Sequence, residues 1–193
     1  MRNRLLFALL ALLCATSVAL SGCVPVVVAG AVGGAALVAT DRRSAGVQLD
    51  DESIELKIMN NIGAGFGDRV HVNATSYNGV VLLSGEVPTQ DLVGQIVEIV
   101  RTTPKVRRVD NEIVVAPVSS IGTRTNDSYI TSKVKARFVE ANKFAPNHVK
   151  VVTERQVVYL MGLVTRAEAD TATQIAATTS GVARVVKLFE YID

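Results

Sequence analysis

The sequence predicts an α+β protein of two tandem repeats, each a small three-stranded mixed sheet covered by two helices in the order αββαβ. The first observation is self-similarity at a spacing of about 76 residues, which aligns residues 51–58 with 127–134 and residues 80–87 with 157–164. The second is that each repeat alternates between a helical and a strand-like apolar period. With 49% hydrophobic residues and 5 Pro in 193 residues, the composition excludes a collagen-like or wholly disordered chain.

The N-terminus predicts a leader that is removed from the mature protein. Arg2 and Arg4 precede an apolar run over residues 5–20, which ends in Leu20-Ser21-Gly22-Cys23. This order of basic, apolar and small residues is typical of a secretory signal peptide, here residues 1–22. The last four residues resemble the bacterial lipobox, in which the cysteine is acylated, so Cys23 is the expected lipidation site. The alternative is an ordinary signal peptide followed by a free thiol.

Residues 23–49 are expected to form the acylated cysteine and an apolar tether. Residues 24–39 carry no charge. A helix of that length covers about 24 Å, which is short of the roughly 30 Å hydrocarbon core. The segment is either a flexible linker or lies in the membrane interface beside the acyl chains. Position 24 is Val. Gram-negative lipoproteins retained in the inner membrane usually have Asp there, so Val favours the periplasmic face of the outer membrane.

The first helix of each repeat is predicted by an apolar stripe. Apolar residues recur at every fourth position, which is the spacing of one helix face. We expect Asp50 or Asp51, and Asn126 or Asp127, to cap the two helices at their N-termini. The stripes consist of Ile54, Ile58 and Ile62 in the first repeat and Ile130, Val134 and Phe138 in the second.

A β-hairpin follows in each repeat. Asn78-Gly79 is a strong two-residue hairpin turn before the apolar strand at residues 80–87. The second repeat has Arg155-Gln156 at that turn, and we expect a different loop there because these residues do not favour positive φ. Gly85 and Gly162 inside their strands predict a bulge or the close approach of a helix.

A second helix and a last strand complete each repeat. Thr89 and Thr165 are the expected N-caps, and Thr165 with Glu168 makes a capping box. The last strands are expected at residues 109–115 and 185–192. The predicted domains are residues 50–117 and 126–193, joined by a linker at residues 118–125.

The sequence contains no catalytic constellation. The glycine-rich residues 63–67 follow a helix and precede a strand, the reverse of a dinucleotide-binding loop. His71 and His148 occupy equivalent repeat positions without a ligand cluster, so we expect structural or surface histidines and no metal site. A net charge of +2 is too balanced for nucleic-acid binding. We therefore expect no enzyme activity, no cofactor and no nucleic-acid partner.

The charge around the first helix differs between the repeats. The net charge there is −3 in the first repeat, from Asp50, Asp51, Glu52 and Glu55 against Lys57. It is +2 in the second repeat, from Asp127 and Glu140 against Lys133, Lys135, Arg137 and Lys143. Tyr129 lies off the core stripe, near Lys133 on a helical wheel. An aromatic among basic residues suits an anionic membrane surface, and a solvated helix face is the alternative.

The repeat motifs resemble the dual BON-domain outer-membrane lipoproteins. The resemblance rests on the L-x-G-x-V motifs at residues 83–87 and 160–164, on Gly181 before Val182-x-x-Val185, and on Asn126-Asp127 at a helix. It departs at residues 103–106, where the family's Gly is missing, and at Arg155-Gln156.

This resemblance implies a non-enzymatic lipoprotein that supports outer-membrane integrity and binds anionic phospholipid through its second domain. The expected lipid-binding residues are Tyr129, with Lys133, Lys135 and Arg137 pairing with phosphates. The alternative is an adaptor that binds envelope proteins in the periplasm through the same helix or an exposed strand edge.

Overall fold

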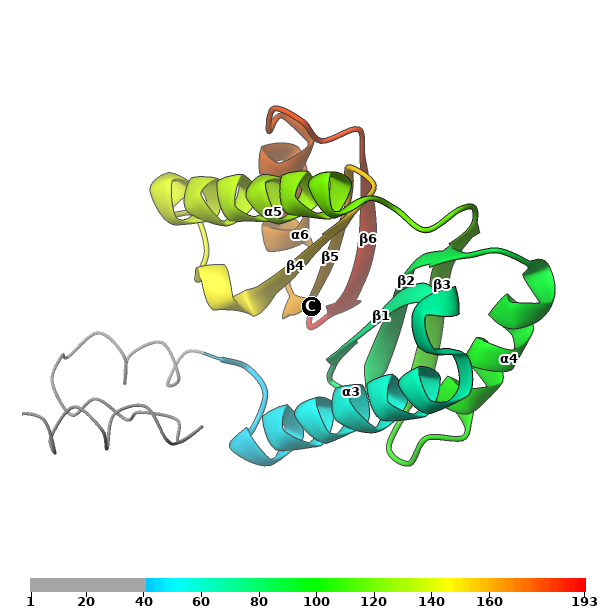
Figure 1. The fold of residues 1–193 in the computed structure, drawn as a ribbon. Helices are drawn as coiled ribbons and strands as arrows, with labels where there is room; N and C mark the ends of the chain where they lie inside the picture. Colours follow the sequence, from blue (N-terminus) through cyan, green and yellow to red (C-terminus); the bar gives the residue numbers. More distant parts are fainter. Residues whose placement is uncertain (1–40) are drawn as a thin grey trace, which may run out of the picture. The chain divides into compact units, whose positions relative to one another are not determined.

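The computed structural model describes residues 41–193, which form two αββαβ repeats as predicted (Figure 1). The first repeat comprises α3 (Ala45–Phe66), the 3-10 helix η1 (Gly67–Arg69), β1 (His71–Tyr77), β2 (Val80–Val87), α4 (Gln90–Arg101) and β3 (Arg108–Val115). The second comprises α5 (Ile121–Ala141), the 3-10 helix η2 (Pro146–His148), β4 (Val149–Glu154), β5 (Val157–Val164), α6 (Arg166–Ala177) and β6 (Arg184–Tyr191).

Each repeat has a three-stranded mixed sheet with the second strand in the middle. β1 pairs antiparallel with β2, and β2 pairs parallel with β3. β4, β5 and β6 repeat this order. The hairpin needs only a tight turn, whereas the parallel pairing needs the crossover helix, α4 or α6. In the first hairpin the register places His71 opposite Glu86.

The predicted apolar stripes form the core on the helix-covered face of each sheet. Ile54, Ile58 and Ile62 of α3 pack with α4 and the first sheet. Their counterparts in α5, together with the alanines of α6, pack on the second sheet. The small side chains of Ala169, Ala172 and Ala176 are almost fully buried, so α6 lies close to its sheet.

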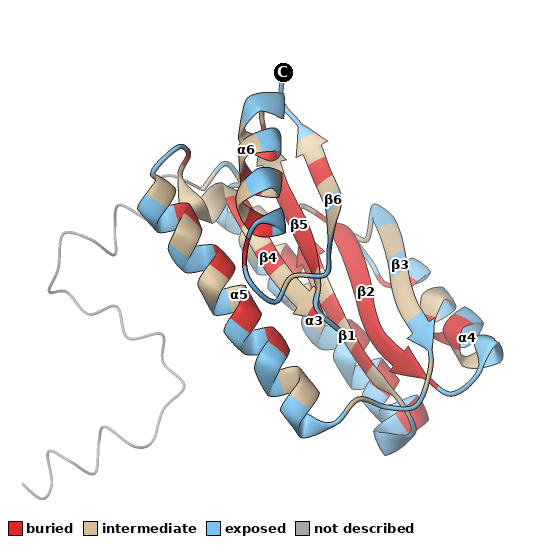
Figure 2. Cartoon of the chain, turned by 90° about the horizontal axis from the view of Figure 1, so that it is seen from above, coloured by how far each residue is buried: buried red, intermediate tan, exposed pale blue. Residues whose placement is uncertain are grey.

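The opposite faces of the two sheets share a third apolar cluster. It contains Tyr77, Val80 and Leu82 of the first repeat with Tyr159 and Met161 of the second. β2 is consequently buried at every position, on both of its faces (Figure 2). This explains why the sequence of β2 is almost continuously apolar instead of alternating.

The prediction that Asp50 or Asp51, and Asn126 or Asp127, cap the first helices is wrong. α3 and α5 begin earlier, within the predicted tether and linker, at the N-caps Ser44 and Ser120. These hydroxyls accept hydrogen bonds from the amides of Val47 and Thr123. Asp51 and Asp127 instead lie inside the helices and are buried.

The two buried aspartates hold the hairpin turns. The Asp51 carboxylate accepts hydrogen bonds from the amides of Asn78 and Gly79, each at 2.8 Å. The Asp127 carboxylate accepts hydrogen bonds from the amides of Arg155 and Gln156 at 2.8 and 2.9 Å. Charge-assisted bonds of this kind are stronger than neutral ones, so each aspartate fixes its turn to the first helix.

The prediction of a different loop at Arg155-Gln156 is also wrong. Both residues have positive φ, 51° and 64°, as Asn78 and Gly79 do at 54° and 73°. The two bonds to Asp127 offset the cost of this backbone conformation, so the unfavourable residues adopt the same type of turn.

Gly85 and Gly162 mark a close approach of the neighbouring strand, not of a helix. A Cβ atom at Gly85 would lie 2.0 Å from the carbonyl oxygen of His71, and one at Gly162 would lie 2.2 Å from that of His148. The hairpin backbones therefore leave no room for a side chain at either position.

Candidate functional site

The outer face of α5 exposes apolar side chains. Tyr129 is 61% exposed, as predicted from its place off the core stripe, and Ile121 and Val139 are exposed on the same helix. Ile121 and Val139 lie about five helical turns apart, so they point in the same direction from the helix axis. Tyr129 lies within about 80° of both around that axis, so the three side chains form one stripe. We call Ile121, Tyr129, Val139 and the adjoining lysines 133 and 135 the α5 face.

Lys133 is held beside Tyr129. Its Nζ atom lies 4.7 Å from the centre of the tyrosine ring and donates a hydrogen bond to the carbonyl oxygen of Ser180. The ring and the ammonium group therefore form a cation–π pair at the surface. This pair places a positive charge next to an exposed aromatic ring.

Arg137 and Lys135 differ in their surroundings. The Nη1 atom of Arg137 donates to the carbonyl oxygen of Ile175 at 2.9 Å and to the hydroxyl of Thr179 at 2.8 Å. Arg137 thus ties α5 to the C-terminal end of α6, a role that the sequence analysis did not foresee. Lys135 is exposed on α5.

The corresponding helix of the first repeat also exposes apolar residues, with acidic neighbours. Leu49 and Leu56 of α3 are each 65% exposed. Leu56 and Met59 line a shallow groove of about 380 Å³ together with Glu52, Glu55 and Ala74. Glu55 is already paired with Lys150 of the second repeat at 2.8 Å. The α3 groove therefore has an acidic rim where the α5 face has lysines.

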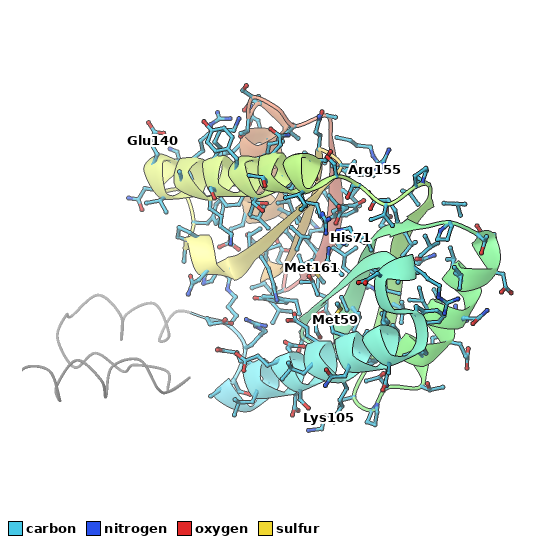
Figure 3. The ribbon with its side chains drawn as sticks, in the orientation of Figure 1. Met59, His71, Lys105, Glu140, Arg155 and Met161 are labelled. Carbon is cyan, nitrogen blue, oxygen red and sulfur yellow. The ribbon has the colours of Figure 1, made fainter. Side chains whose placement is uncertain are left out.

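A polar network joins the two repeats beside their shared apolar cluster, and two of its members, His71 and Arg155, are labelled in Figure 3. Glu86 of β2 is fully buried and lies 3.3 Å from the guanidinium of Arg155. Glu154 of β4 accepts a hydrogen bond from the amide of Asn73 at 3.2 Å. The sequence did not reveal this network, because its members come from both repeats and meet only when the sheets pack together.

Burial shifts the pKa values of two groups in this network and of Tyr159 beside it. Burial, followed by the charge of Glu86, raises the pKa of Glu154 to about 7. Burial and the nearby Arg124 guanidinium lower the pKa of His71. Burial, followed by Glu112, raises the pKa of Tyr159 to about 12. Buried carboxyl and phenol groups resist ionisation because their anions lose water.

His71, Glu86 and Glu154 bring three potential metal-ligand atoms within 4.8 Å of one another. Both ring nitrogens of His71 nevertheless face N–H donors, Arg124 at 3.4 Å and Asn73 at 3.5 Å. A metal ligand needs a free lone pair on one nitrogen, and its other nitrogen usually donates to an acceptor. The side chains of His71, Glu86 and Glu154 therefore suit an ion-pair network better than a cation site.

The segment before α3 connects to the second repeat. Arg42 forms two bonds with Glu168, at 2.7 and 2.9 Å, and donates to the carbonyl oxygen of Leu163. Arg43 pairs with Asp51 and lies 3.9 Å from the centre of the Tyr77 ring. Within residues 41–193 no helix is long and apolar enough to cross a membrane. Cys23 and the segment that follows it up to residue 40 lie outside the described residues.

Comparison with known proteins identifies the repeats. The BON domain family model matches residues 50–117 and 126–193. The chain is 39% identical to "Outer membrane lipoprotein DolP" of Haemophilus influenzae over 186 residues, covering 95% of this chain and 96% of the relative. It is 32% identical to a 21 kDa hemolysin of Actinobacillus pleuropneumoniae, covering 79% and 80% of the two chains. It is 30% identical to osmotically-inducible protein Y of Escherichia coli, covering 71% and 70%.

These matches agree with the repeated αββαβ fold, and the match to the lipoprotein named DolP covers 95% of this chain. The protein therefore belongs to the family of dual BON-domain proteins similar to DolP.

Proposed function

We propose that this protein is an acylated lipoprotein on the periplasmic face of the outer membrane, without enzymatic activity, whose second repeat docks on anionic phospholipid and supports envelope integrity. Cys23 carries the anchor in this proposal, and the α5 face makes the second contact. The outer-membrane assignment is supported by the relative named outer membrane lipoprotein DolP. The lipid contact is argued from the α5 face itself.

The observation that carries the lipid contact is the exposed Tyr129 ring with the Lys133 ammonium 4.7 Å from its centre. Tyrosine prefers the membrane interface, where its ring meets apolar chains and its hydroxyl meets water. Lys133 and Lys135 each add about 1 kcal/mol of attraction to an anionic leaflet. Ile121 and Val139 extend the apolar stripe on either side of Tyr129 along the helix.

Arg137 has a secondary part in this proposal. Its Nη1 atom already donates hydrogen bonds at the end of α6, so a bidentate contact with a lipid phosphate would break those bonds. We therefore assign the phosphate contacts first to Lys133 and Lys135, with Arg137 adding to the local positive field.

Vesicle co-sedimentation of residues 41–193 tests the lipid contact, since this fragment lacks Cys23 but contains all three apolar clusters. We expect binding to anionic vesicles, not to neutral ones, and weakening as salt rises. Tyr129→Ala and Lys135→Glu should each weaken binding about tenfold. Lys133→Glu should weaken it too, but Lys135 is the cleaner position because Lys133 also bonds to Ser180.

Lys57→Glu is the matched control. Lys57 is exposed on α3 at the position that corresponds to Lys133 in the repeat alignment. This variant changes the net charge by the same amount and should bind like the native fragment. Equal loss in Lys57→Glu and Lys135→Glu, or no binding to any vesicle, would exclude docking through the α5 face.

An envelope-protein adaptor is the second candidate, favoured by the α3 groove. The groove exposes Leu56 and Met59 on the helix with acidic neighbours, which suits an apolar segment with basic flanks. Binding through such a groove should be lost in Leu56→Asp and be much less sensitive to salt than lipid docking. Leu56→Asp should leave vesicle binding unchanged, which separates the two functions.

A further inference from the structure

Two carboxyl groups from different repeats are buried side by side where the sheets meet. Glu86 of β2 is fully buried and Glu154 of β4 is 6% exposed. Oxygen atoms of both lie within 4.8 Å of each other and of a nitrogen of His71. Two anions so close in a site away from water repel strongly, so the protonation of this pair affects how the repeats fit together.

The partners of the two carboxyl groups differ. Glu86 receives a hydrogen bond from the Arg155 guanidinium at 3.3 Å and another from the amide of Ser119 at 3.3 Å. Glu154 receives its bond from the neutral amide of Asn73. A guanidinium stabilises a carboxylate, whereas an amide does so far less. Glu86 therefore has a cationic donor and Glu154 a neutral one, so Glu154 is the member of the pair that we expect to gain or lose a proton.

His71 supplies no positive charge to Glu154 near neutral pH. Its Nε2 atom is 3.9 Å from Glu154, and its Nδ1 atom is 3.4 Å from Arg124. Burial and the Arg124 charge lower the pKa of His71, so the ring is neutral at pH 7. Protonation of His71 becomes important only in more acidic solution.

The surroundings of Glu154 bring the pKa of its carboxyl group close to neutral pH. Burial, Glu86 and Asp127 raise its pKa, and Asn73 and Arg124 lower it, with a result of about 7. Several titratable or charged groups face Glu154: His71 of β1, Glu86 of β2, Tyr159 of β5, Asp127 and Arg124 of α5, and Arg155 in the turn after β4.

We propose that Glu154 is a proton-controlled latch between the two repeats, closed when its carboxyl group is neutral beside Glu86 and loosened when that group ionises. Loosening would separate β4 from the edge of the first sheet and admit water to the apolar cluster that includes Tyr77 and Tyr159. The latch is a property of the repeat junction and does not depend on lipid binding.

The direction of the pH effect follows from the two pKa shifts. Glu154 has a folded pKa above the ordinary 4.5, so its contribution to the closed junction is complete below pH 4.5 and is lost as the pH rises through about 7. His71 acts in the opposite direction, because its lowered pKa makes the closed junction less stable below about pH 6.5. The junction should therefore be tightest in mildly acidic solution, loosen as the pH rises toward 7, and change little at higher pH.

Hydrogen exchange of the full mature chain in detergent at pH 6 and pH 8, corrected for intrinsic exchange rates, tests the latch. If Glu154 has its ordinary pKa in the open junction, protection of β1 and β4 should fall about tenfold between these pH values. Glu154→Gln, which is always neutral, should keep equal protection at both. Glu52→Gln, at an exposed position on α3, should behave like the native chain.

A second variant covers the case in which Glu154→Gln does not fold. Glu86→Gln removes the neighbouring charge, so the pH at which protection is lost should move downward. The pKa of Glu154, followed by NMR of its carboxyl carbon, should move downward with it. Unchanged protection of the native chain between pH 6 and 8 would overturn the latch. An equal loss in Glu154→Gln, or an unmoved midpoint in Glu86→Gln, would overturn it as well.

Discussion

At the scale of single residues, the two repeats solve the same backbone problem with different side chains. The hairpin turn is Asn78-Gly79 in one repeat and Arg155-Gln156 in the other, with positive φ at all four residues. A second pair shows the same contrast, since Lys105 has a φ of 72° where the second repeat has Gly181 at 95°. In both comparisons one repeat tolerates a side chain in a conformation that favours glycine, at a cost of about 1 kcal/mol per residue.

This comparison predicts that Gln156→Gly stabilises the protein. Gln156 is exposed, so the substitution relieves its backbone strain without removing a buried contact, and the amide bond to Asp127 is retained. We expect the free energy of unfolding in urea to rise by about 1 kcal/mol.

The reverse substitution in the other repeat is its control. Gly79→Ala should lower the free energy of unfolding for two reasons. The added Cβ would lie 3.0 Å from the carbonyl oxygen of Lys105, and the alanine would have to adopt the positive φ of Gly79. A stabilised Gly79→Ala, or a destabilised Gln156→Gly, would contradict this account of the turns.

At the scale of secondary structure, the start of α6 gathers more interactions than its capping box. Thr165 and Glu168 form the predicted box. Glu168 also binds Arg42, which arrives from the segment before α3. The hydrogen bond from Arg42 is the main cause that lowers the pKa of Glu168 to about 2. One carboxylate thus caps a helix of the second repeat and holds the N-terminal segment.

Glu168→Gln should therefore destabilise the protein by about 2 kcal/mol at pH 7. Because the folded pKa of Glu168 lies below 4.5, its stabilisation is complete above pH 4.5 and is lost as the pH falls toward 2. In thermal unfolding measured from pH 7 to pH 3, the melting temperature of the native chain should approach that of the variant as the pH falls. Glu98→Gln, exposed on α4, is the control, and an equal effect there would exclude a specific role for Glu168.

The order of the elements and their core faces were predictable from the sequence, because apolar periodicity is a local signal. Ile54, Ile58 and Ile62 are buried as predicted, and Tyr129 is exposed. The helix starts were mispredicted, because Asp51 and Asp127 have the chemistry of caps but bind amides of turns more than 25 residues away in sequence. The same limit hid Glu86 and Glu154, whose proximity depends on the packing of two sheets.

At the scale of the described molecule, the two repeats are coupled mainly through apolar packing. Ion pairs surround the shared cluster, including Arg107 with Glu190 at 3.0 Å and Arg184 with Glu112 at 3.8 Å. Their partly exposed charges are screened by water, so each contributes little. Leu82 and Met161 in the cluster are almost fully excluded from water. The shared cluster therefore supplies most of the stability of the junction.

Neighbouring residues on β5 allow this coupling to be measured. Leu160 packs in the core of the second repeat, whereas Met161 packs in the cluster shared with the first. Because successive side chains point to opposite faces, Leu160→Ala and Met161→Ala should each cost about 3 kcal/mol but in different places. Hydrogen exchange should show faster opening of β2 in Met161→Ala, and of α5 and α6 in Leu160→Ala. If both variants gave the same exchange pattern, the repeats would unfold as one unit without a separable junction, and loosening at Glu154 would have to involve the whole protein.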